Sequence, residues 1–292
     1  MPIDPSAVGR EAGPDEVSWT ARDAMLYALG VGAGQDDALA ELDLTTENTA
    51  GTALRMLPSY AVVIVQNAVR ARPAFGDVDR TKLVHAEQGF ELHRPLPVEG
   101  RARVSSRVTG IHDKGSGALV AMQSTVVDAA SGELLATTSS SVFIRGEGGF
   151  GGERGPAAAA PLPERAPDFE RSVATRPDQA LLYRLSGDRN PLHSDPGFAA
   201  RGGFERPILH GMCTYGITGR ILLHAFAGGD PARVRGMQGR FTRPVLPGDL
   251  LKVQGWHEGG GVVRFRTLSA GAQPVIDQGV LWLAQPGAAS GS

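Results

Sequence analysis

The sequence has little cysteine, no long apolar run and no paired metal-ligand motif. Cys213 is the only cysteine among 292 residues, so neither an intramolecular disulfide nor a cysteine-rich zinc site can form. The seven histidines show no ligand spacing such as His-Glu-x-x-His. The longest apolar run, residues 61–65, is far too short to cross a bilayer. We therefore expect neither a metal centre nor a membrane segment.

The sequence also has no large excess of positive or negative charge. The formal net charge is −2, and Lys and Arg form no dense run, which argues against nucleic acid as a partner. The first ten residues lack a basic segment followed by an apolar one, and the C-terminal Ala-Ser-Gly-Ser is not a peroxisomal address. With 41% apolar and 21% charged residues, the composition is that of an ordinary globular protein. We expect a cytoplasmic protein.

What the chain does contain is an internal repeat. Residues 94–104 resemble residues 243–253, at an offset of 243 − 94 = 149. Two further matches follow in the same order: Pro58 with Pro207 (207 − 58 = 149), and Tyr27 with Tyr183 (183 − 27 = 156). Three matches in one order predict a duplicated fold unit.

Each half follows the same order of elements. Apolar and polar residues alternate from 102 to 108, as in a half-buried strand. The apolar stretch 58–71 would be a strand in isolation, but its counterpart 207–226 is long for a strand and favours a buried helix. Further strands are expected over residues 118–128, 133–144, 250–256, 262–268 and 274–284.

The fold expected from these patterns is α+β, with a buried helix wrapped by an antiparallel sheet in each half. The halves would span residues 1–145 and 169–286, joined by a Gly/Pro/Ala-rich linker over 146–168. The linker contains Gly-x-Gly-x-x-Gly at residues 146–151, after an apparent strand. A dinucleotide site needs an apolar helix directly afterwards, and Gly-Pro followed by alanines comes instead, so no nucleotide site is expected.

The segment that carries chemistry lies in the second half. Asp188 and His193 are five residues apart, and on a helix they would point about 140° away from each other. They converge only if the chain turns between them, which Asn190-Pro191 favours because the residue before proline avoids helical geometry. Gly187 permits a left-handed backbone just ahead. We expect Asp188, Asn190 and His193 to line one polar pocket.

A second candidate group follows at Pro207-Ile-Leu-His-Gly-Met, which we expect to open the buried helix. Free amides at a helix N-terminus favour a negatively charged oxygen, and Gly211 has no side chain to block its N–H. This amide could stabilise an enolate-like oxygen. His210 is interpreted as structural, bonding backbone near the helix start.

Plainer interpretations remain for several residues. Asp188 alone could be a helix N-cap, although Asp195 before Pro196 fits that role better. Cys213, within an apolar helix, is more typical of core than of a nucleophile. Tyr27 and Tyr183 recur in both halves, which favours packing over chemistry.

The string from Tyr183 to Pro196, followed by Pro207–Cys213, resembles the hydratase-2 motif of the MaoC-like double-hotdog family. The resemblance extends to residues 83–88, 113–117 and the Gly-Gly-Phe-Gly-Gly run at 148–152. It covers most of the chain and is similar to (R)-specific 2-enoyl-CoA hydratases and (3R)-hydroxyacyl-thioester dehydratases.

The resemblance implies reversible addition of water to trans-2-enoyl thioesters of fatty-acid metabolism. It makes Asp188 and His193 the acid–base pair, with Asn190 holding the water and the Gly211 amide forming the oxyanion hole. It implies no cofactor, since coenzyme A is part of the substrate, and an acyl-CoA or acyl-carrier-protein thioester as partner to a monomer or homodimer. The implied substrate contacts are Glu47 (a supporting acid), His85, Ala86, Lys114, Arg189 and Phe241. Ala86 stands where peroxisomal members have glycine.

The repeat then restricts catalysis to one half. Gly32 lies opposite Asp188 (188 − 156 = 32), and the first half has no Asp-x-Asn-Pro-x-His. We expect the first half to form the wall of an acyl tunnel. Two other functions stay open: a non-catalytic acyl-thioester-binding hotdog, and a hotdog thioesterase. The sequence does not assign the two protons to Asp188 and His193 individually.

Overall fold

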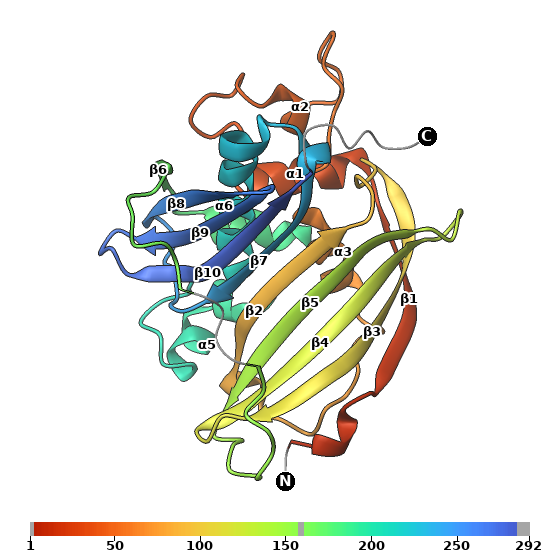
Figure 1. The fold of residues 1–292 in the computed structure, drawn as a ribbon, viewed down its shortest axis with the longest axis vertical. Coiled ribbons are helices and arrows are strands. Elements are labelled where there is room, and N and C mark those ends of the chain that lie inside the picture. Colours follow the sequence, from red (N-terminus) through yellow and green to blue (C-terminus); the bar gives the residue numbers. More distant parts are fainter. Residues whose placement is uncertain (1–2, 157–160, 285–292) are drawn as a thin grey trace.

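The computed structural model describes residues 3–156 and 161–284. Its strands are antiparallel and form one continuous sheet (Figure 1). In the first half they are β1 (Glu11–Trp19), β2 (Leu83–Leu92), β3 (Gly100–Asp113), β4 (Gly117–Asp128) and β5 (Leu134–Arg145). In the second half they are β6 (Phe169–Ala174), β7 (Val234–Phe241), β8 (Leu250–Gly259), β9 (Val262–Ser269) and β10 (Pro274–Leu283).

The spatial order of the strands confirms the duplication. The sheet runs β1-β3-β4-β5-β2-β7-β10-β9-β8-β6, so the second five repeat the first five in reverse. The halves meet where β2 pairs with β7, from Glu87 opposite Arg240 to Glu91 opposite Gly236. The expected α+β architecture with antiparallel strands is therefore confirmed. The strand predicted for residues 102–108 is part of the longer β3.

Helices lie against this sheet or above its end (Figure 1). α3 contacts β2, β4 and β5, and α6 contacts β7, β8 and β10. Of the 17 residues of α6, 12 are buried, which explains why its sequence is apolar on nearly every side. The α-helices are α1 (Ala21–Gly30), α2 (Leu42–Thr45), α3 (Tyr60–Asn67), α4 (Gln179–Tyr183), α5 (Pro196–Arg201) and α6 (Gly211–Ala227). The 3-10 turns are η1 (Pro5–Ala7), η2 (Arg80–Lys82), η3 (Arg184–Ser186), η4 (Pro191–His193) and η5 (Pro231–Arg233).

Both buried helices are shorter than the sequence predicts. The prediction that Pro207 opens the helix was wrong, because residues 207–210 are not helical and the Leu209 N–H donates to the Val245 carbonyl at 2.7 Å. α6 begins four residues later, at Gly211. In the first half, Ala68 leaves helical geometry at ψ 74°, so α3 has only 8 residues.

The glycine-rich linker folds back onto the β3–β4 turn. The Asp113 carboxyl group accepts hydrogen bonds from the amides of Gly115, Gly149 and Gly151, at 2.8 to 2.9 Å. Gly149 and Gly151 have φ of 80° and 79°, which L side chains rarely adopt. These amides lower the pKa of Asp113. The linker glycines thus surround a carboxyl group of the protein itself.

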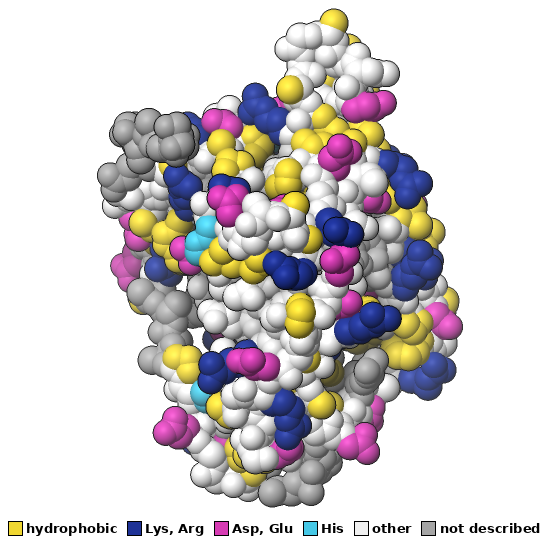
Figure 2. Space-filling model, turned by 90° about the vertical axis from the view of Figure 1, so that its right-hand side faces the viewer, with side chains coloured by type: hydrophobic (Ala, Val, Ile, Leu, Met, Phe, Trp, Pro, Cys, Tyr) yellow, Lys and Arg dark blue, Asp and Glu magenta, His cyan; other side chains and the backbone are white. Residues whose placement is uncertain are grey.

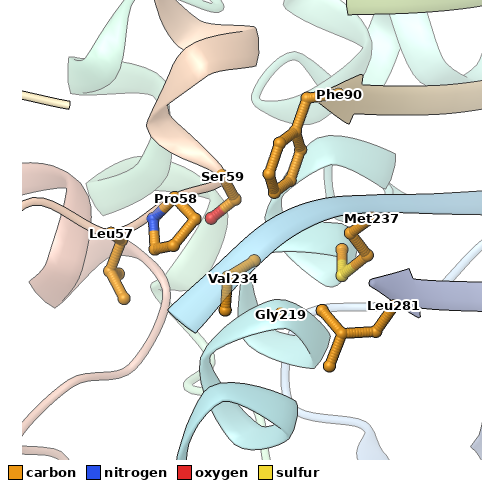
Figure 3. A pocket seen from close by; sticks show the side chains of 8 residues that line it. All are labelled: Leu57, Pro58, Ser59, Phe90, Gly219, Val234, Met237 and Leu281. Atoms are coloured by element: carbon orange, nitrogen blue, oxygen red, sulfur yellow. The ribbon is translucent and has the colours of Figure 1, made fainter. Parts of the chain in front are cut away.

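A small cavity lies where the two halves meet (Figure 3). Its volume of about 10 Å³ is close to the minimum for one water molecule. It cannot hold an acyl chain in this conformation. The lining comes equally from both halves: Leu57, Pro58, Ser59 and Phe90 from the first, and Gly219, Val234, Met237 and Leu281 from the second.

Charged side chains of both signs are interspersed on the face shown in Figure 2, without a large area of one sign. This mixture agrees with the near-zero net charge of the sequence. Among the described helices, none is both long and apolar enough to cross a membrane.

Candidate active site

A glycine and an asparagine from opposite halves hold the loop that carries Asp188. Asn67, the last residue of α3, donates its side-chain N–H to the Ser186 carbonyl at 3.1 Å. Gly187 follows with φ 127°, and a Cβ there would lie 1.9 Å from Asn67 Oδ1. Only glycine fits this approach. Asn67 was missed in the sequence, where it is one polar residue at the end of an apolar stretch.

The turn between Asp188 and His193 is built from side-chain acceptors. Asp188 Oδ1 accepts the Asn190 N–H at 3.1 Å, and Asn190 Oδ1 accepts the Leu192 N–H at 3.1 Å, capping η4. Asp188 caps no helix, whereas Asp195 caps α5 through the Phe198 N–H at 2.9 Å. The Asp188 side chain is therefore not explained by capping.

His193 lies at the end of η4 with its ring nitrogens in different environments. Its Nδ1 lies 2.9 Å from the Ile208 carbonyl. A carbonyl only accepts, so Nδ1 carries the proton and Nε2 of the neutral ring keeps its lone pair. Burial lowers the pKa of His193, opposed by the Ile208 hydrogen bond and by Asp188. With its proton on Nδ1 and a lowered pKa, His193 is a neutral acceptor at pH 7.

His210 completes a three-residue cluster with Asp188 and His193. The ligand atoms of the three side chains lie within 4.8 Å of one another. The His210 ring stacks on His193 with centroids 3.8 Å apart, and its Nε2–H donates to the Asp188 carbonyl at 3.1 Å. His210 does bond backbone, as expected, but the partner lies 22 residues away rather than at the helix start.

The cluster resembles a cation site by residue type alone. Each imidazole donates one N–H to a backbone carbonyl, which leaves His193 Nε2 and His210 Nδ1 without a proton. The cluster therefore offers proton acceptors beside the Asp188 carboxyl group.

The facing wall comes from α6, β7 and β2. Gly211 is the first residue of α6, and no backbone acceptor in the described chain takes its N–H. A Cβ at Gly211 would lie 3.3 Å from the Phe241 ring, which is tighter than most Cβ contacts, so a larger residue would push against that ring. The Phe241 ring lies 5.0 Å from that of His85, where β2 bulges and Ala86 is the extra residue. Burial lowers the pKa of His85, while its Glu87 hydrogen bond and the nearby Asp188 raise it.

Three of the residues implied by the resemblance lie outside this group. Glu47 is exposed in the loop after α2. Arg189 is exposed on the loop that carries Asp188. Lys114 is exposed in the β3–β4 turn, where its Nζ donates to the Arg154 carbonyl. That turn shares the sheet end with the start of β2, three strands away, or roughly 14 Å.

A second buried acid of the first half, beside Asp113, is Glu41, which the sequence did not single out. Its carboxyl oxygens accept hydrogen bonds from Arg220 Nη1 at 2.7 and 2.8 Å and from His224 Nε2 at 2.7 Å. Both residues lie on α6. Burial alone would raise the pKa of Glu41, but His224 and Arg220 hold it at about 2. This ion pair borders a cleft of about 250 Å³ beside Gly32, the position opposite Asp188 in the repeat.

Two family models match the chain. Residues 158–278 match the MaoC like domain, and residues 17–146 match the MFE-2 hydratase 2 N-terminal domain. The chain is 46% identical over 290 residues to 3-hydroxyacyl-thioester dehydratase Y of Mycobacterium tuberculosis, covering 96% of this chain and 98% of that protein. A MaoC-like dehydratase from Phytophthora capsici superimposes with a TM-score of 0.88 at 31% identity, covering 98% and 100% of the two chains.

A third protein supports the fold alone. A Mycobacterium tuberculosis protein described as having a double hotdog fold superimposes with a TM-score of 0.59 at 17% identity. The alignment covers 96% of each chain. The tandem hotdog architecture expected from the sequence is thereby confirmed.

Proposed function

We propose, from the premise that this chain belongs to the MaoC-like hydratase and dehydratase family, that it is a hydro-lyase acting on enoyl and (3R)-3-hydroxyacyl thioesters. The observation that carries the proposal is the approach of Asp188 to a neutral His193 beside the N-terminus of α6. Water addition needs groups that move two protons and a donor for the thioester oxygen. The second half offers a candidate for each: Asp188 and His193 for the protons, and the Gly211 amide on the facing wall for the thioester oxygen.

The Asp188–His193 pair would handle the protons. Hydration adds the water hydroxyl to C3 of the thioester and a proton to C2, and dehydration reverses both steps. His193 Nε2 offers a lone pair to a water proton, because its Nδ1–H is held by Ile208. The pair then gives one proton to C2, so its own protonation state is the same before and after the reaction. General acid–base catalysis of this kind contributes about 10²–10⁴ in rate.

The Gly211 amide would stabilise the charge that develops on the thioester oxygen. It is the first amide of a 17-residue helix, so its N–H needs no partner within the helix and lies at the positive end of the helix dipole. Such a donor contributes about 10²–10³ in rate. Met212, the next residue, is buried, which leaves Gly211 as the more accessible amide.

The thioester would reach this wall past His85, Ala86 and Phe241. Their place beside Gly211 supports a contact with the acyl-thioester end of the substrate. Lys114, at the same sheet end but about three strands away, would meet a more distant part such as a phosphate. The exposed Arg189 is free to do the same, whereas Glu47 stays a prediction based on resemblance.

The test is hydration of crotonyl-CoA, followed by the loss of enoyl absorbance and by chiral analysis of the product. We expect the 3R product, and a fall in kcat of at least about 10²-fold for Asp188→Ala and for His193→Ala. Asp178→Ala is the matched control, because Asp178 is an exposed carboxyl paired with Arg176. Parent-like kcat in either site variant, or the 3S product alone, would refute the assignment.

The same assay separates the two other functions. A thioesterase releases free coenzyme A, which a thiol reagent detects, and leaves the enoyl group intact. A non-catalytic binding protein changes neither signal. The retained Asp188, Asn190 and His193 favour hydration over both.

A further inference from the structure

Two segments of the second half are tied together by reciprocal contacts. His193 donates its Nδ1–H to the carbonyl of Ile208 at 2.9 Å, and His210 donates its Nε2–H to the carbonyl of Asp188 at 3.1 Å. Each histidine thus bonds the backbone of the segment that carries the other. Between these bonds the two rings stack, with an interplanar angle of 29° and centroids 3.8 Å apart.

The His210 ring is suited to holding position rather than carrying a proton. It is 1% exposed and packs against Tyr183, with ring centroids 5.0 Å apart. Burial, with His193 adding to it, holds the pKa of His210 well below its ordinary value, so the ring carries a single proton. The Asp188 carbonyl requires that proton on Nε2. Its remaining nitrogen, Nδ1, is buried and meets no partner within the described residues.

His210 lies in the chain next to the residue that begins α6. It directly precedes Gly211 and, at ψ 130°, is the last non-helical residue before α6. The bond to Asp188 therefore joins the start of the helix to the loop of the acid–base pair. A shift of about 1 Å between reacting groups can cost about 10²-fold in rate.

We propose that His210 is a positioning residue that fixes the Asp188–His193 pair relative to the Gly211 amide. This role rests on the hydration reaction proposed above, and it adds the residue that holds the reacting groups in place. His210 touches neither substrate nor reacting atoms in this role; it acts through the Asp188 backbone and the His193 ring. Its loss should lower kcat and leave substrate affinity nearly unchanged.

The experiment compares two substitutions that each keep one of its contacts. His210→Phe keeps an aromatic ring to stack on His193 but has no N–H for Asp188. His210→Gln keeps an N–H donor of similar reach but loses the ring. We expect His210→Phe to lower kcat for crotonyl-CoA about 10²-fold, with KM within about twofold of the parent. His210→Gln keeps a donor for the Asp188 carbonyl, so its kcat should be about tenfold higher than that of His210→Phe.

Tyr183→Phe is the matched control for packing beside His210. The Tyr183 hydroxyl is buried without a partner within the described residues, so its removal should leave kcat at the parent value. If Tyr183→Phe loses as much activity as His210→Phe, general packing explains the effect and the proposal fails. It also fails if His210→Phe keeps kcat within about threefold of the parent, or raises KM alone.

Amide hydrogen exchange gives a readout that does not depend on turnover. Exchange over residues 186–194 should accelerate in His210→Phe, while the β3–β4 pair stays as protected as in the parent. Uniform acceleration would indicate general destabilisation and would count against a positioning role. The hydration reaction is judged separately, because an inactive parent enzyme refutes that reaction whatever the His210 variants do.

Discussion

Gly187→Ala should lower kcat, although Gly187 has no side chain that could react. The added Cβ would lie 1.9 Å from Asn67 Oδ1, whereas real Cβ contacts stay above 3.0 Å. Either the Asn67 side chain gives up its hydrogen bond to the Ser186 carbonyl, or the loop and the end of α3 separate by about 1.1 Å (3.0 − 1.9). Both changes release the loop that carries Asp188, the next residue. A displacement of about 1 Å near reacting groups costs about 10²-fold in rate, which is the fall in kcat that we expect.

The same substitution also strains the backbone. Gly187 has φ 127°, and such a conformation costs an L residue about 1–3 kcal/mol. Gly203→Ala separates the two effects, because Gly203 has φ 83° and an added Cβ there would meet nothing within 4 Å. We expect Gly203→Ala to lower the free energy of unfolding without a comparable loss of kcat. Urea denaturation and the crotonyl-CoA assay measure both quantities.

A double variant identifies the contact responsible. Replacing Asn67 by Ala in the Gly187→Ala background removes the clashing oxygen but leaves the strained φ. Part of the lost kcat should return, so that the two substitutions are not additive. Full additivity, or parental kcat in Gly187→Ala alone, would show that the first half does not position the Asp188 loop through Asn67.

Two further predictions follow from the helix start and from the buried ion pair. Gly211→Pro removes the amide hydrogen at a helix position that tolerates proline, so kcat should fall about 10²–10³-fold while thermal unfolding stays near the parent; unchanged kcat would exclude the amide as the oxyanion donor. Glu41→Gln leaves the 5% exposed Arg220 charge without its partner and should cost about 3–5 kcal/mol of unfolding free energy at pH 7, measured in urea. Because the folded pKa of Glu41 is about 2 and its ordinary value 4.5, the stability that ionised Glu41 contributes is complete above pH 4.5 and is lost as pH falls toward 2. The gap between parent and variant should therefore narrow over that range, and a constant gap would contradict the ion-pair explanation.

The repeat and the strand periodicity were enough to predict the fold, because both depend on local patterns. The alternation after residue 100 and the matched prolines predict two α+β units, and the strand order shows them as a reversed pair. The helix starts were predicted less well. Leu209 pairs with Val245, a contact 36 residues away (245 − 209 = 36), and no local pattern around Pro207 announces it.

The site was predictable in its chemical groups but not in its supports. Asp188, Asn190 and His193 stand in one short segment, so the turn at Pro191 could be inferred from sequence. The hydrogen-bond partners of Asn67 and His210 are distant backbone carbonyls, which no residue pattern indicates. The sequence therefore predicted a structural His210 without its partner, and missed Asn67. Glu41 was missed for a related reason, since its partners come from a helix about 180 residues further on.

The pairing of β2 with β7 is the sheet's central seam, and it implies that the covalent link between the halves is dispensable for their assembly. If the chain were cut between β5 and β6, each fragment would keep five strands and its own buried helix. Separation of the fragments would add one newly unpaired edge to each, β2 in the first and β7 in the second. Those edges are complementary, so the two fragments should recombine into a working enzyme when co-expressed. Either fragment alone should instead pair with copies of itself, because an uncovered strand edge recruits another strand.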